Sequence, residues 1–395
     1  MLRSVTALAS AGSEVRVALF HPALIAGGIQ RVFVNLACGF RDCGLAVDMV
    51  QATPASGLHP AVPEGVRQID LNAGRALASL APLVRYLRRE RPQVLISGAI
   101  QTNLVAVGAR HIAGIRLRLI LTEHNVISAI STDAPMARTR MTPFFVRNFY
   151  PRADELVAVS QGAALDLVRT LGERAHNVHV ICNPILGPDF WRRAAEPLSD
   201  SRMESDPRPI VLAVGRLHYH KDYPTLLRAI AILRRRIDAR LVFLGDGEER
   251  ATLEARSREL QIADAVSLLG DVPNPLPYMK RAQVLALSSV AEALPTVLIE
   301  ALAVNLPIVA TDCPTGPREV LEDGKYGMLV PVGDSELMAE ALDAVLRSSP
   351  RPEVPPEALE RFQHDHVIAQ YLELMGIDAP DHHHHKKHIE PSLLL

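Results

Sequence analysis

Two cations lie five residues apart in the segment VGRLHYHKDYP, namely Arg216 and Lys221. The apolar run before Arg216 predicts a strand, and Pro224 predicts a helix that begins soon after Lys221. Because the start of a helix offers unpaired N–H groups, these groups and the two cations together could bind a diphosphate. A pair of solvated surface charges is the alternative interpretation. His218 and His220 lie between the cations, but no third ligand is evident, so we expect no metal at this turn.

Two carboxylates, Glu292 and Glu300, flank an apolar run in the segment EALPTVLIE. Pro295 cannot lie in the middle of a helix but suits its first turn, which predicts Glu292 in a loop and Glu300 within the next helix. Unpaired N–H groups near Thr296 and Val297 could then hold a phosphate. Glu300 could accept hydrogen bonds from ribose hydroxyls, and Glu292 from sugar hydroxyls. The alternative is a buried polar network at Glu300 and a favourable charge near the helix start at Glu292.

Three further turns follow predicted strands, and each is weaker by itself. Gly27 and Gly28 separate a strand from a helix and would let a ligand approach the backbone, although they do not form the dinucleotide fingerprint GxGxxG. Gly245 follows another strand. The loop at residues 268–279, which includes Val272, has an irregular backbone that could contact a nucleobase edge. A simple turn explains each of them equally well.

The elements that must position these residues alternate between short apolar runs and longer amphipathic segments. This alternation predicts βαβ units and parallel sheets that are buried on both faces. In the first half, the predicted strands are VRVALF (15–20), VLISG (94–98), LRLILTEHN (117–125), ELVAVS (155–160) and VHVICN (178–183). Residues 187–209 have four prolines and no periodicity, which indicates a linker. A second series of strands begins at residue 210, so we expect two Rossmann-like domains with ligands at the carboxyl ends of the strands.

Composition excludes several classes of protein. The chain has 395 residues, is 48% hydrophobic and contains no apolar run of membrane-spanning length, and we expect no signal peptide. Its four cysteines show no metal-ligand spacing and fit a reduced cytoplasm. Residues 1–188 hold 19 arginines, no lysine and 12 acidic residues, whereas the remainder is acidic. Opposite charges on the two halves suggest separate partners, although compositional drift would give the same pattern.

Taken together, the segments GRLHYHKDYPTLL and SSVAEALPTVLIEALAVNLPIVATD resemble the GT-B retaining glycosyltransferases of bacterial polysaccharide and glycolipid assembly, which are similar to glycosyltransferase family 4. The resemblance covers about residues 15–376. It implies an α/β GT-B fold, in which two Rossmann-like domains face each other across a cleft. It also implies an acceptor-binding domain at residues 1–188, a nucleotide-sugar-binding domain at 189–355 and a helix at 356–378 that crosses back to the first domain. We expect residues 379–395, which include a four-histidine run, to be a disordered tail.

The resemblance also implies a role for each matching position. Arg216 and Lys221 are similar to the diphosphate-binding pair, and Glu300 to the ribose-binding glutamate. Glu292 is similar to the glutamate that contacts the transferred sugar. His124, in the segment TEHN, is similar to the histidine that faces the donor sugar from the first domain.

The remaining matching positions complete the implied donor site. Gly27 and Gly28 are similar to a glycine loop near the phosphates. Gly245, Val272, Thr296 and Val297 would complete the nucleotide contacts.

Two residues depart from the family pattern. Ala293 and Asn305 stand where the family commonly has glycine. Ala293 could narrow the loop after Glu292, whereas asparagine tolerates a positive φ and should preserve its turn. Neither change removes a charged group, so we expect an active enzyme.

The resemblance implies catalysis without a metal or other cofactor. The acceptor hydroxyl would attack on the face from which the diphosphate leaves, and a diphosphate oxygen would take its proton. We expect a UDP-sugar donor, in particular a UDP-N-acetylhexosamine, and a glycan or polyprenyl-diphosphate-linked sugar as acceptor. A GDP-mannose-dependent mannosyltransferase, a GT-B sugar-nucleotide epimerase and a non-catalytic nucleotide-sugar-binding protein are the alternatives.

Basic and aromatic residues at 136–152 predict contact with an anionic membrane surface. A partly buried helix with solvated arginines is the alternative interpretation. We expect a cytoplasmic protein at the inner face of the cell membrane and no nucleic acid partner.

Overall fold

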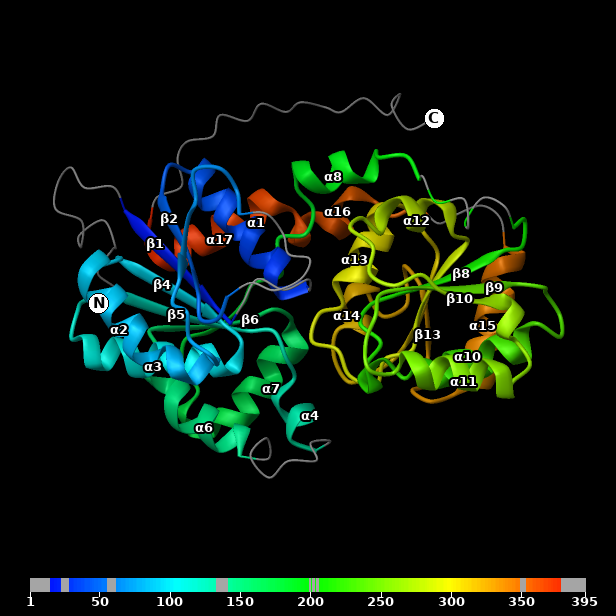
Figure 1. Cartoon of the computed structure of the whole chain (residues 1–395), viewed down its shortest axis with the longest axis horizontal. Helices are drawn as coiled ribbons and strands as arrows, with labels where there is room; N and C mark the ends of the chain where they lie inside the picture. Colours follow the sequence, from blue (N-terminus) through cyan, green and yellow to red (C-terminus); the bar gives the residue numbers. More distant parts are fainter. Residues whose placement is uncertain are drawn as a thin grey trace.

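The computed structural model describes residues 15–22, 28–54, 62–132, 141–198, 200, 203, 206–348 and 353–377. Two α/β units lie side by side in Figure 1, and each contains one parallel sheet with helices on its faces. The first sheet has the strand order β3-β2-β1-β4-β5-β6-β7, and the second has the order β10-β9-β8-β11-β12-β13. The predicted α/β architecture with two Rossmann-like units is confirmed.

The first unit contains the following elements. Its strands are β1 (Arg16–His21), β2 (Ala46–Gln51), β3 (Arg67–Asp70), β4 (Val94–Gly98), β5 (Arg118–Glu123), β6 (Glu155–Ala158) and β7 (Val178–Val180). Its helices are α1 (Gly28–Asp42), α2 (Leu80–Glu90), α3 (Ile100–Ala113), α4 (Ile127–Thr132), α6 (Thr142–Phe149) and α7 (Gln161–Leu171), with short 3-10 turns η2 (Ala76–Ser79), η3 (Tyr150–Arg152) and η4 (Gly172–Arg174). The central strands β1, β4, β5 and β6 are almost wholly buried, because helices cover both faces of the parallel sheet.

The second unit repeats the same organisation. Its strands are β8 (Ile210–Val214), β9 (Arg240–Leu244), β10 (Val266–Leu268), β11 (Val284–Leu287), β12 (Ile308–Thr311) and β13 (Met328–Val330). Its helices are α10 (Tyr223–Leu233), α11 (Arg250–Glu259), α12 (Leu276–Arg281), α13 (Thr296–Ala303), α14 (Pro317–Val320) and α15 (Ser335–Arg347), with short turns η5 (Tyr219–Lys221) and η6 (Ala263–Ala265).

The chain passes between the units twice. After β7 it enters α8 (Pro188–Ala194), a helix within the segment that the sequence predicted as an irregular linker. Pro188 begins this helix, and burial of the Phe190 side chain stabilises it. The segment therefore forms a helix although its sequence has no apolar periodicity. The return passage consists of α16 (Pro356–Leu359), η7 (Glu360–Phe362) and α17 (His364–Met375). The segment predicted as a helix at residues 356–378 is therefore divided by η7 into two helices.

Helix α17 packs against α1 of the first unit (Figure 1), as the resemblance implied. Gly39 makes this close packing possible, because a Cβ there would lie 2.3 Å from Ile368. The two passages are also joined to each other. The amides of Ile185 and Leu186 both donate to the Phe362 carbonyl, at 3.1 and 3.0 Å, and the His364 amide donates to the Leu186 carbonyl at 2.8 Å.

Candidate active site

Lys221 and Glu292 form the centre of the site in the second unit. Lys221 ends the turn η5 that follows β8, and Glu292 lies in the loop between β11 and α13. The Lys221 Nζ is 2.6 Å from Glu292 Oε1, and Ser289 Oγ donates to the same oxygen at 2.6 Å. The two charged side chains are 22% and 14% exposed. This partial burial strengthens a charge-assisted hydrogen bond while leaving both groups accessible to a ligand.

Arg216 lies at the same strand end but has a different partner. Its side chain is 72% exposed, and its Nη2 is 3.2 Å from Glu248 Oε2. Lys221 lies close by, since a Cβ on Gly215 would be 3.3 Å from Lys221 Cε. The structure therefore brings both predicted cations to one turn, with Arg216 largely in solvent. Glu248 was not predicted from the sequence as the partner of Arg216.

Glu300 lies within α13 and contacts the other unit. The helix begins at Thr296 directly after Pro295, so Glu292 precedes it and Glu300 lies inside it, as predicted. Glu300 is buried, and its Oε1 accepts a hydrogen bond from Arg31 Nη1 of α1 at 3.0 Å. Burial raises the pKa of Glu300, and the positive charges of Arg31 and Arg193 oppose this rise. Among the described residues, this bond to Arg31 is the one hydrogen bond of the Glu300 carboxylate.

Two arginines near Glu300 were not identified from the sequence. Arg31 lies in the first turn of α1, close to the Gly28 that begins the helix. Its position three residues after Gly28, in the first turn of the predicted helix, was the one sequence feature that could have indicated Arg31. Arg193 belongs to α8 and donates from Nη2 to the Pro273 carbonyl at 3.0 Å, in the loop predicted to contact a nucleobase. Val272 is half-buried in the same loop and packs against the core.

His124 follows β5 in the first unit and is half-buried. Its Nε2 is 3.1 Å from Thr122 Oγ1, and burial lowers the pKa of His124 to about 4. Its ring is neutral at pH 7 as a result. The preceding residue, Glu123, is buried and accepts hydrogen bonds from Tyr150 and Asn125. Burial raises the pKa of Glu123 to about 7.

The predicted glycines differ in what the structure shows. Gly28 begins α1, whereas Gly27 lies outside the described residues. Gly245 has a φ of 132°, and a Cβ there would lie 2.2 Å from the Gly215 carbonyl oxygen. Close packing of two strand ends therefore explains Gly245 without a ligand. Asn305 has a φ of 55°, the left-handed conformation predicted for it.

Thr296 and Val297 are the first two residues of α13, where helix geometry leaves N–H groups without intrahelical partners. Within the described part of the chain, no group of three or more His, Cys, Asp or Glu side chains could hold a metal ion. No helix of the described residues is both long and apolar enough to cross a membrane.

Two facing Rossmann-like units, with charged side chains at the strand ends between them, define a GT-B fold. A family profile described as Glycosyltransferase Family 4 matches residues 26–185, and one described as Glycosyl transferases group 1 matches residues 196–361. The lipopolysaccharide core biosynthesis glycosyltransferase LpsE of Rhizobium meliloti is 30% identical over 363 residues, which are 89% of this chain and 96% of LpsE. This chain therefore belongs to the glycosyltransferase family 4-like enzymes and is a glycosyltransferase.

Other similar proteins agree with the family. The N-acetylgalactosamine-N,N'-diacetylbacillosaminyl-diphospho-undecaprenol 4-alpha-N-acetylgalactosaminyltransferase of Campylobacter jejuni is 32% identical over 244 residues. That match covers 62% of this chain and 64% of the relative, so it spans slightly less than two thirds of that protein. The crystal structure of HepE from Anabaena in complex with UDP and glucose has a TM-score of 0.74 at 19% identity. It covers 92% of this chain and 99% of HepE, and it shows the shared fold.

Proposed function

We propose that this glycosyltransferase transfers a sugar from a UDP-sugar, in particular a UDP-N-acetylhexosamine, with retention of the anomeric configuration. The acceptor is a hydroxyl of a glycan or a polyprenyl-diphosphate-linked sugar in surface polysaccharide or glycolipid assembly. The observation that carries the proposal is the contact between Lys221 and Glu292, with Arg216 at the same turn and Glu300 at the next helix. The activity for which the Campylobacter relative is named, transfer of N-acetylgalactosamine to a sugar linked to diphospho-undecaprenol, supports the choice of sugar and acceptor.

The charges suggest how the donor would be held. Arg216 and Lys221 would bind the diphosphate and stabilise its negative charge as the sugar leaves. Glu300 uses Oε1 to bind Arg31, so Oε2 is available to accept hydrogen bonds from ribose hydroxyls. Glu292 would accept hydrogen bonds from the transferred sugar, beside the cation that holds the diphosphate.

The transfer step requires no nucleophilic side chain in this proposal. The acceptor hydroxyl attacks the anomeric carbon on the face from which the diphosphate leaves. The glycosidic bond forms as the bond to the diphosphate breaks, and a diphosphate oxygen takes the hydroxyl proton. His124 would face the donor sugar as a neutral ring, because its pKa is lowered to about 4. We propose that the two cations supply the charge stabilisation without a required metal ion.

The first test is nucleotide binding, followed by turnover. UDP, GDP and ADP are titrated separately and the shift in melting temperature is recorded. We expect stabilisation by UDP, and then release of UDP from UDP-N-acetylglucosamine or UDP-N-acetylgalactosamine when an acceptor is added. Proton NMR of the product reports the anomeric configuration. A preference for GDP would overturn the UDP assignment, and no response to any of the three nucleotides would overturn the donor site.

We also propose that helix α6 contacts an anionic membrane surface. Phe144 of α6 is 59% exposed, Met141 directly before the helix is 49% exposed, and Arg147 of α6 is also exposed. Exposed apolar and basic groups on one segment suit the interface between water and lipid. Vesicles with anionic lipids should bind the protein at low salt and release it at high salt. Equal binding to neutral vesicles would contradict an electrostatic contact.

A further inference from the structure

Ser160 of the first unit contacts the loop that carries Glu292 in the second. This serine is fully buried and lies directly before α7. Its Oγ accepts a hydrogen bond from the Ala163 amide at 3.1 Å, which caps the helix. The same Oγ donates to the Ala293 carbonyl at 2.7 Å. Because a hydroxyl has one proton, its single donor bond is committed to the other unit.

The loop at Glu292 is held from both sides. Thr315 Oγ1, in the second unit, donates to the Glu292 carbonyl. Ser160, in the first unit, donates to the next carbonyl along the chain, that of Ala293. The second unit therefore supplies one of these two side-chain hydrogen bonds by itself. The other, from Ser160, forms when the two units are in contact.

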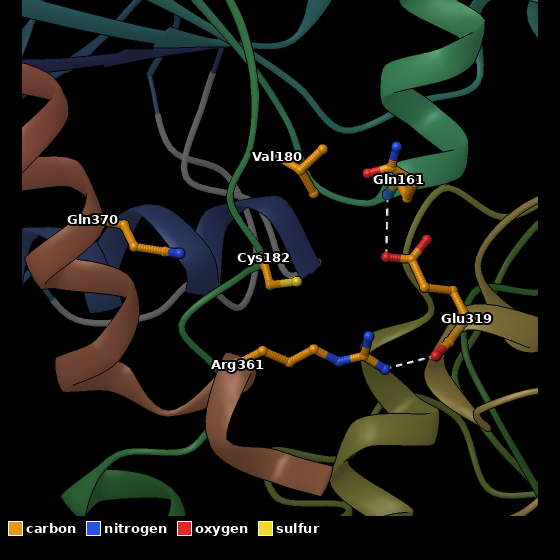
Figure 2. A pocket seen from close by; sticks show the side chains of 6 residues that line it. All are labelled: Gln161, Val180, Cys182, Glu319, Arg361 and Gln370. Carbon is orange, nitrogen blue, oxygen red and sulfur yellow. Dashed lines mark hydrogen bonds between the residues drawn. The ribbon is translucent and has the colours of Figure 1, made fainter. Parts of the chain in front are cut away.

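The first turn of α7 is anchored to the second unit beside this bond. Figure 2 shows the Glu319 carboxylate below Gln161, whose amide donates to Oε1 at 3.1 Å. The Gly162 amide donates to Oε2 at 3.3 Å. A carboxylate is favourable at the start of a helix, where the peptide dipoles present partial positive charge. Gly162 has no room for a side chain, since a Cβ there would lie 2.7 Å from Thr315 Cγ2.

This contact lies beside open space. A cavity of about 340 Å³ is lined by Gln161, Val180, Cys182, Glu319, Arg361 and Gln370 (Figure 2). Arg361, from the return passage, donates from Nη2 to the Glu319 carbonyl at 2.6 Å. The contact between Gln161 and Glu319 borders this cavity, whereas the bond from Ser160 to the Ala293 carbonyl is buried. Two units of one chain commonly move relative to each other, and the Ser160 bond is a contact that such a movement would break and re-form.

We propose that Ser160 is a positioning residue for transfer, whose bond to the Ala293 carbonyl completes the orientation of Glu292 when the units close. The inference rests on the proposed function, because it assigns the donor sugar to Glu292. It couples the acceptor-binding unit to the donor sugar without any contact between Ser160 and the donor. The loop is fully oriented for transfer in the closed state, whereas nucleotide binding does not depend on Ser160.

The test compares four variants by their kcat for transfer, their KM for the donor and their Kd for UDP. For Ser160→Ala we expect a roughly tenfold loss of kcat, the size of effect that one buried hydrogen bond gives, with the Kd for UDP within about twofold of wild type. The side chains introduced by Ser160→Asn and Ser160→Asp have nearly the same size and shape as each other, and both can cap a helix. An asparagine amide can donate to the Ala293 carbonyl, whereas an ionised aspartate cannot. We therefore expect Ser160→Asn to retain more kcat than Ser160→Asp.

The fourth variant, Ser79→Ala, is the matched control. Ser79 is also fully buried in the first unit and precedes α2, on the far side of that unit (Figure 1). The Ser79→Ala variant should keep the wild-type kcat. Equal losses in Ser79→Ala and Ser160→Ala, equal kcat in Ser160→Asn and Ser160→Asp, or wild-type kcat in Ser160→Ala would each overturn the role of Ser160. Failure of the wild-type protein to bind UDP would instead overturn the proposed donor, so the two failures are distinguishable.

Discussion

Glu292 and Glu300 each contact one cation, but the two cations come from different parts of the chain. Lys221, the partner of Glu292, belongs to the same unit and lies 2.6 Å away. Arg31, the partner of Glu300, belongs to the other unit and lies 3.0 Å away. The charged partner of Glu292 at the sugar end of the proposed donor site therefore comes from its own unit, although Ser160 of the other unit holds the same loop. The ribose end is completed across the cleft, so its affinity should depend on how the two units are arranged.

The largest expected effect is at Lys221. Lys221→Ala removes the cation that would stabilise the leaving diphosphate, and it leaves Glu292 without its charged partner. We expect kcat to fall by about 10²–10³, the usual cost of losing one such group. Initial rates with a UDP-sugar measure this loss. Lys325→Ala is the control, since Lys325 is an exposed lysine of the same unit that pairs with Glu322. Equal rates for the two variants would contradict the assignment.

Substitution of Glu300 should change the Kd for UDP, whereas substitution of Glu292 should change kcat. Glu300→Ala removes the proposed ribose acceptor, so the Kd for UDP should rise roughly 10- to 100-fold, in line with the value of hydrogen bonds to a charged group. Glu292→Ala should lower kcat by a similar factor and leave the Kd for UDP nearly unchanged. Calorimetry and steady-state rates on both variants separate these effects. Identical changes in both constants would remove the distinction between the two carboxylates.

A third buried carboxylate, Glu123, has neutral hydrogen-bond partners, Tyr150 and Asn125, among the described residues. Its pKa is raised to about 7, so between pH 4.5 and 7 the folded protein binds more protons at this site than the unfolded chain. Glu123 therefore contributes about 3 kcal/mol of stability below pH 4.5, and this contribution is lost as the pH rises through 7. Chemical unfolding of wild type and Glu123→Gln across this range measures the difference.

The neighbouring His124 acts in the opposite sense, because its folded pKa lies below that of an unfolded histidine. The wild-type protein alone would not separate the two contributions. The free energy of unfolding of the variant minus that of wild type isolates Glu123 and should become more favourable to the variant as the pH rises. A constant difference over the whole range would show that the pKa of Glu123 is the same in the folded protein and in the unfolded chain.

The smallest expected effect is at Arg31. Arg31→Ala should raise the Kd for UDP about threefold, because a partly exposed ion pair contributes modestly. In the Glu300→Ala background the same change should have no further effect if Arg31 acts through Glu300. Arg41→Ala, at the far end of the same helix, should bind UDP like wild type. Additive losses in the double variant would indicate that Arg31 contacts the nucleotide directly.

Sequence patterns predicted the parts of the fold that rest on uninterrupted apolar runs. β4 occupies residues 94–98, the predicted range. β2 was missed because Asp48 interrupts its apolar residues. In the structure Asp48 is fully buried and accepts hydrogen bonds from Arg67 and Tyr86, at 2.6 Å for both bonds to Oδ2. These partners are distant in sequence, so the residues of β2 alone do not show that the buried Asp48 carboxylate has hydrogen-bond donors.

The candidate site shows the same limit. Pro295 fixed the helix start, and so the sequence correctly separated the surroundings of Glu292 and Glu300. It could not reveal that Arg31 reaches Glu300 from 269 residues away. Nor could it explain Ala293, where the family commonly has glycine. In the structure the Ala293 side chain is buried and the backbone carbonyl makes the contact with Ser160. Contacts between the units depend on their arrangement, which local periodicity does not encode.

The hydrogen bonds between the two passages have a mechanical consequence. Two independent linkers would let one unit tilt, twist and slide relative to the other. Ile185 and Leu186 are instead bonded to Phe362, and Leu186 to His364, so both linkers move as one short ribbon. Such a ribbon bends easily about one axis and resists the other motions. We therefore expect the two units to open mainly about one axis, so that one distance between them, followed over time by a pair of spectroscopic labels, should report the movement.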